Sequence, residues 1–139
     1  MFLRRLAILI LAGATVLGAQ DAMCPLKPDT VYLSFLYNAY NDVYFNGNLP
    51  RNIVVDWDPM LIPQHNMGLT ECPDDKVASD GCKITLSPDQ QRWSRVWMMT
   101  LLHEECHVAT WGKEKDAHGK QFHQCMRRLA NEGAFDELW

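Results

Sequence analysis

Residues 97–122 read WMMTLLHEECHVATWGKEKDAHGKQF and contain the clearest motif of the chain. Within this stretch His103, Glu104 and His107 form an HExxH pattern. Residues four apart lie one turn apart on a helix, so both imidazoles leave the same helical face. Apolar residues recur around them at helical spacing, which predicts a helix buried in a core. They are Met98, Leu101, Leu102, Val108 and Ala109.

A third histidine follows at a distance that suits the same metal ion. His118 lies eleven residues after His107, beyond a polar loop. Catalytic zinc is held by three protein ligands with water in the fourth position, whereas structural zinc is usually closed by four ligands, often Cys. The pattern therefore predicts a hydrolytic zinc site with His103, His107 and His118 as ligands. His123 competes with His118 for the third position, and His65 is interpreted as a surface residue in a loop between prolines.

Length and charge restrict the class of protein. The chain has 139 residues, which suits one domain with a single core. Its net charge is -4, and its Lys and Arg residues form no cluster of the kind that binds phosphates. DNA is thus the weakest of the candidate partners.

The first 19 residues have the pattern of a secretory signal peptide. Arg4 and Arg5 precede the apolar run 6–17, and small residues follow before the polar Gln20. The run is short for a membrane span, although an uncleaved anchor remains an alternative. We therefore expect an exported protein, periplasmic or secreted, with no other contact with the membrane.

Five cysteines fit an exported chain that contains disulfides. Cys72 and Cys82 flank a loop rich in Pro, Asp, Ser and Gly, and they are the preferred pair. Cys106 and Cys125, on the helices that flank the loop before His118, can form a second pair, which leaves Cys24 free. Cys106 should point away from the histidine face and is a poor metal ligand.

The other elements predict an α+β domain over residues 31–132, between a linker at 20–30 and a tail at 133–139. A helix is expected over 31–45, capped by Asp29 or Thr30. Three short strands are expected to form a small antiparallel sheet, packed on three or four helices. The strands are 52–57, 67–70 and 83–86. The HExxH helix begins at Pro88 or at Ser94, and the last helix covers 119–131.

Several stretches together resemble a known family. They are YNDVYFNGNLP (40–50), NIVVDW (52–57), Gly68 with Leu69, KITLSP (83–88), TLLHEECH (100–107) and HGKQF (118–122). In this order they are similar to the landmarks of the SprT-like zinc metallopeptidase domain, the fold of the Spartan-type proteases. The resemblance covers roughly residues 33–129 and is more specific than HExxH alone.

The resemblance implies a zincin-like fold with the HExxH on a central helix. It implies Zn²⁺ held by His103, His107 and His118, with Glu104 as the general acid/base. The expected activity is hydrolysis of peptide bonds in a protein or peptide substrate. Glu105, beside Glu104, is predicted to face solvent.

Two other functions remain open at this point. One is a zinc-stabilised binding module without catalysis, and the other is an exported zinc amidase that acts on cell-wall peptides. The intact Glu104 and the lack of an obvious fourth ligand weigh against the binding module. The sequence favours no particular oligomeric state.

Overall fold

The structure is a computed structural model, and it describes residues 28–138. Three α-helices, three strands and two 3-10 helices make up an α+β fold, as expected. In chain order they are α1 (Thr30–Tyr44), β1 (Val54–Trp57), η1 (Pro59–Leu61), β2 (Gly68–Glu71), β3 (Lys83–Leu86), η2 (Pro88–Arg92), α2 (Ser94–Thr110) and α3 (Lys120–Asn131). The predicted signal peptide at 1–19, Cys24 and the linker up to residue 27 lie outside the described residues.

The sheet is mixed, which corrects the expectation of a wholly antiparallel one. Its strand order is β1-β3-β2. The β2–β3 pair is antiparallel because one loop joins the two strands as a hairpin, and Thr70 lies opposite Ile84. The β1–β3 pair is parallel, with Val55 opposite Ile84. No hairpin joins these two strands, so local turn chemistry does not determine their relative direction.

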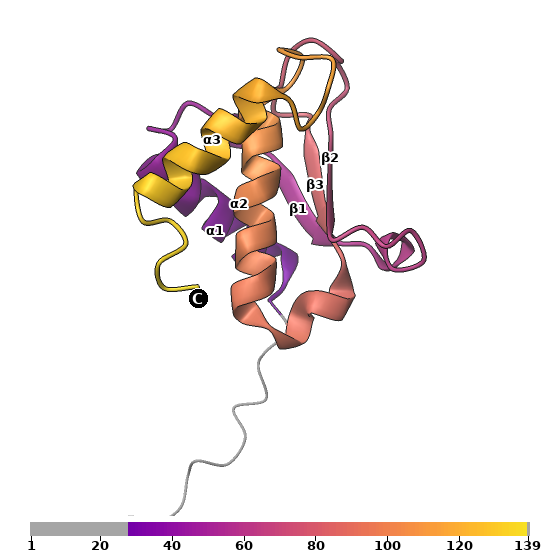
Figure 1. The fold of residues 1–139 in the computed structure, drawn as a ribbon. Coiled ribbons are helices and arrows are strands. Elements are labelled where there is room, and N and C mark those ends of the chain that lie inside the picture. The colour runs from indigo at the N-terminus through magenta and orange to yellow at the C-terminus, as the bar shows by residue number, and fades with distance from the viewer. Residues whose placement is uncertain (1–27, 139) are drawn as a thin grey trace, which may run out of the picture.

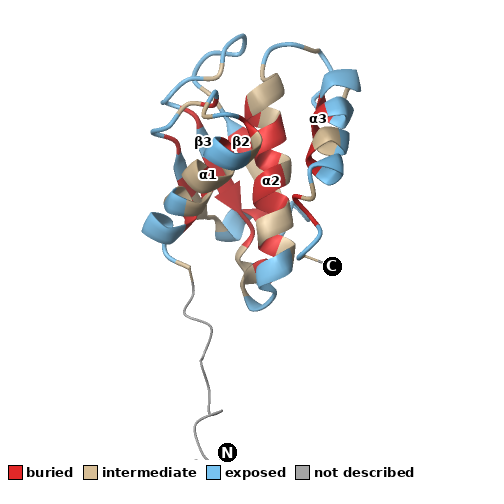
Figure 2. Ribbon diagram, turned by 90° about the vertical axis from the view of Figure 1, so that its left-hand side faces the viewer, coloured by how far each residue is buried: buried red, intermediate tan, exposed pale blue. Residues whose placement is uncertain are grey.

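The helices lie on one side of the sheet, with α2 between the sheet and α3 (Figure 1). The core forms where α1, α2 and the strands meet, and Figure 2 shows the buried residues concentrated there. Trp97 of α2 makes edge-on ring contacts with Tyr32 at 6.4 Å and Trp57 at 6.1 Å. The core continues past residue 132, because Ala134 and Phe135 are also buried against it.

The ends of the helices follow local sequence signals. The Asp29 carboxylate accepts a hydrogen bond from Tyr32 N at 2.8 Å and so caps α1. The short helix η2 ends before α2, so the HExxH helix begins at Ser94 and not at Pro88. Of the helices in residues 28–138, none has the length and apolar character needed to cross a membrane.

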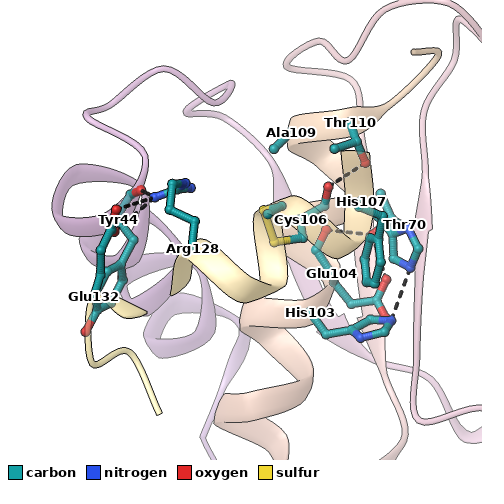
Figure 3. The surroundings of a disulfide bond; sticks show 12 residues. Tyr44, Thr70, His103, Glu104, Cys106, His107, Ala109, Thr110, Arg128 and Glu132 are labelled. Carbon is teal, nitrogen blue, oxygen red and sulfur yellow. Dashed lines mark hydrogen bonds and ion pairs between the residues drawn. A yellow bond between two sulfur atoms is a disulfide. The ribbon is translucent and has the colours of Figure 1, made fainter. Parts of the chain in front are cut away.

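Both cysteine pairings that the spacing allowed are present as disulfides. Cys72–Cys82 closes the loop between β2 and β3. Cys106–Cys125 joins α2 to α3. The second bond lies on the side of α2 opposite His103 and His107 (Figure 3), which agrees with the expected direction of Cys106.

Glu105 is buried, so the prediction that it faces solvent was wrong. Its side chain has no exposed surface, and neither carboxylate oxygen has a hydrogen-bond partner. The sheet, α1 and α3 surround α2, which leaves little of that helix in contact with water. Burial raises the pKa of Glu105 well above its ordinary value. Burial, together with the charge of Glu105, also raises the pKa of Tyr40 to about 12.

Replacing Glu105 should stabilise the fold, and the gain should grow with pH. In the unfolded chain this carboxyl ionises near its ordinary pKa, so above that pH the folded state binds more protons. The free energy of unfolding then falls by up to about 1.4 kcal/mol per pH unit as pH rises. Glu105→Met should remove this loss of stability at high pH. Urea unfolding of the variant and of wild type at pH 5 and pH 8 will measure the difference.

Glu71→Gln, at an exposed carboxylate, is the control. An equal difference between Glu105→Met and wild type at both pH values would contradict the explanation.

Candidate metal centre

Three imidazoles meet at one point between α2 and the start of α3. His103 and His107 leave the same face of α2, one turn apart, and their Nε2 atoms are 3.2 Å apart. His118 comes from the loop before α3, and its Nε2 lies 3.1 Å from that of His107 and 3.2 Å from that of His103. These three side chains form a group that could hold a metal ion.

The three Nε2 atoms cannot all be satisfied by hydrogen bonds to one another. A neutral imidazole Nε2 either carries a proton or offers a lone pair, so three such atoms cannot all pair with one another. A cation at the centre would accept all three lone pairs at once. The donor set, three imidazoles, suits a divalent transition metal.

Burial keeps two of the imidazoles in the form that binds metal. It lowers the pKa of His103 to about 4, with a further contribution from His118. It lowers the pKa of His107 to about 4 as well, with contributions from His103 and His118. Both rings are therefore neutral at pH 7, as metal ligation requires.

The ring of Phe122 packs against all three imidazoles. Its centroid lies 4.8 Å from that of His103, 4.5 Å from that of His107 and 4.7 Å from that of His118. Phe122 is buried, and it belongs to the first turn of α3. This ring limits the orientations that the histidines can adopt.

Two carboxylates hold the backbone around His118. Asp116 Oδ1 accepts a hydrogen bond from His118 N at 3.0 Å. Glu114 Oε2 accepts from Gln121 N at 2.8 Å and from Phe122 N at 3.4 Å. Glu114 thus caps the first turn of α3, where amide groups lack helical partners and negative charge is favourable.

The disulfide loop between β2 and β3 supports the turn that follows α2. Trp111 Nε1 donates a hydrogen bond to the carbonyl of Asp74 at 2.7 Å. Gly112 has a φ of 69°, and a Cβ at this position would lie 2.1 Å from the carbonyl oxygen of Lys76. Only glycine fits this close approach, and it lets the chain reverse toward His118.

Glu104 is buried beside the histidines and is held by β2. Thr70 Oγ1 donates a hydrogen bond to Glu104 Oε2 at 2.8 Å (Figure 3). A Cβ on Gly68 would lie 2.5 Å from Glu104 Oε1, so the carboxylate occupies space that only glycine leaves open. Burial raises the pKa of Glu104 to about 7, while the hydrogen bond from Thr70 lowers it in part.

A pocket of about 500 Å³ opens next to this group. His103, Glu104 and His118 line one part of it, and Gly68 of β2 lines another. Within residues 28–138, β2 is an edge strand of the sheet, and its residue Gly68 lines the pocket.

The structure separates the histidines that the sequence left in competition. His118 joins the cluster, while His123 is exposed and lies outside it. His65 is also exposed, and it lines the pocket. Sequence reasoning missed the roles of Thr70, Phe122 and Glu114. Only the position of Glu114, six residues before α3, offered a local signal, since a carboxylate near a helix start often acts as a cap.

One comparison with known proteins gives a match. The family model described as "SprT-like family" matches residues 33–137. No curated protein and no solved structure matches the chain.

Removing one imidazole should weaken metal binding sharply. We expect one divalent ion per chain, and a loss of affinity of at least about 100-fold in His118→Ala, because even changes in outer contacts of metal ligands cost roughly 10- to 100-fold. Competition with a chromophoric chelator, using Zn²⁺, measures the change. His123→Ala should bind the ion as wild type does. Equal losses in the two variants would remove His118 from the ligand set.

Proposed function

Because this chain belongs to the SprT-like family, whose members are usually zinc metallopeptidases, we propose that it hydrolyses peptide bonds with the aid of zinc. One observation carries the proposal. Three imidazole nitrogens lie 3.1–3.2 Å apart beside a buried carboxylate. With Zn–N distances of about 2.0–2.1 Å, tetrahedral zinc separates its nitrogen ligands by about 3.3 Å, close to this spacing. Zinc held by these three residues would keep one position open for water or substrate.

Glu104 is the proposed general acid and base. Zinc bound here would supply an acidified water and a Lewis acid for the scissile carbonyl. Glu104 Oε1 takes the proton of the attacking water and delivers it to the leaving amine. Thr70 holds the other oxygen, Oε2, so the orientation of the carboxylate is set before substrate arrives.

The edge strand favours an extended peptide as the substrate. Gly68 of β2 lines the pocket, and in the described part of the chain β3 is the one strand that pairs with β2. A peptide can add to such an edge by backbone hydrogen bonds, which would lay its carbonyl groups along the metal-binding residues.

We further propose that the protein acts outside the cytoplasm. Two disulfides in a chain of this size fit an oxidising compartment, and the pattern of residues 1–19 fits a signal peptide.

Export can be tested by expressing the full chain with a C-terminal tag. The mature product should be found outside the cytoplasm, shortened by the first 19 residues, with Cys72, Cys82, Cys106 and Cys125 resistant to thiol labelling until reductant is added. A full-length product in the cytoplasm with reactive thiols would refute the export proposal. Intact-protein mass spectrometry distinguishes the two outcomes.

Glu104→Gln should abolish turnover while the metal stays bound. The amide keeps the size of the side chain but cannot accept a proton from water, so we expect kcat to fall by roughly 10²- to 10⁴-fold. Cleavage of casein and the metal content of the purified protein should be measured together.

Asp89→Asn is the matched control, since Asp89 is an exposed carboxylate of η2 that does not line the pocket. Its activity should equal that of wild type. Glu105 is unsuitable as a control because it is buried. Full peptidase activity in Glu104→Gln would eliminate the proposed role.

A further inference from the structure

The lining of the pocket beside the histidine cluster combines polar and apolar side chains. The polar ones are His103, Glu104 and His118, together with His65, Asn66 and Thr100. The apolar ones are Met67, Met99, Met126 and Phe135, and these four are called the apolar wall. These four residues come from the approach to β2, from α2, from α3 and from the segment after α3, so the fold assembles the wall from separate elements.

We infer that the apolar wall is a specificity pocket for a large apolar side chain next to the scissile bond of the substrate. The inference rests on the proposed peptidase function. It adds a substrate class, namely peptides with a residue such as Leu, Met or Phe at one of the two positions that flank the cleaved bond.

The charge of the lining supports this substrate class. Among the described residues that line the pocket there is no Lys or Arg, and Glu104 is the one carboxylate. A charged substrate side chain would therefore lose water without gaining a counter-ion, which is unfavourable. A buried apolar side chain instead gains from leaving water.

The size of the pocket and the methionines in its lining indicate a preference for large apolar side chains in general, and not for one residue type. The whole pocket has a volume of about 500 Å³, which lies within the usual range for ligand sites and is larger than a Leu or Phe side chain. Methionine is flexible and adapts to apolar groups of different shapes. Three of the four wall residues are methionines, and the pocket should therefore accept several large apolar residues.

The segment after α3 keeps Phe135 in the wall. Ala134 N donates a hydrogen bond to the carbonyl of Leu129 at 3.0 Å, so the chain turns back toward α3. Phe135 is 9% exposed and packs with the core, so its side chain is held in place in the apolar wall. Met126 is only partly buried, and its substitution should disturb the fold less.

Peptides that differ only beside the cleaved bond test the inference. One series carries Leu, Phe, Lys or Asp at each of the two flanking positions, and mass spectrometry locates the cut. We expect kcat/KM for Leu or Phe to exceed that for Lys or Asp by about 10- to 100-fold at one of the positions. Met126→Lys should reduce this ratio and raise relative cleavage of the Asp peptide. Met60→Lys, at an exposed methionine of η1 that does not line the pocket, should leave the ratio unchanged.

The design separates failure of the pocket from failure of the proposed function. Equal cleavage of all peptides by wild type, or equal effects of the two Lys variants, overturns the specificity pocket and leaves the peptidase in place. If wild type cleaves no peptide, the specificity pocket is tested by binding alone. The affinity of Glu104→Gln protein for labelled Leu and Asp peptides is then measured by fluorescence anisotropy. Tighter binding of the Leu peptide supports the pocket although the peptidase proposal falls, and equal binding overturns both.

Discussion

The structure depends on bringing three imidazoles together, two from α2 and one from the loop that follows it. His103 and His107 belong to a rigid helix, but His118 reaches them through a polar loop. That loop is held from outside, by the contact of Trp111 with the segment between β2 and β3, and from within, by Glu114 and Asp116. Phe122 then packs under all three rings. The arrangement that could hold a metal ion is thus a property of the whole fold and not of the HExxH pattern alone.

The helix α2 divides its surface between two tasks. One side presents His103 and Glu104 to the pocket and His107 to His118, while Cys106 on another side is bonded to α3 (Figure 3). Because the sheet, α1 and α3 all contact this helix, even the carboxyl of Glu105 is buried. The cost of burying that carboxyl falls on the stability of the fold.

Features set by local spacing were predictable, and those set by distant contacts were not. Helical periodicity was enough to bring His103 and His107 to one face, and a short loop was enough to return His118 to them. The direction of β1 depends on a partner strand nearly thirty residues away, since Val54 pairs with Lys83. Thr70 is 34 residues before Glu104, and no local pattern links a strand threonine to a helix carboxylate. Phe135 joins the pocket only because the chain turns back after α3.

The absence of a side chain at position 68 has a consequence for how this protein can vary. Gly68 lies at a sheet edge, yet a methyl group added there would lie 2.5 Å from Glu104 Oε1 and 2.9 Å from its Cδ, so the buried carboxylate would have to move. The first effect of a larger residue at position 68 would therefore be felt on the helix and not within the strand. Variation of this strand position is restricted by the neighbouring carboxylate, whatever the strand itself could accept.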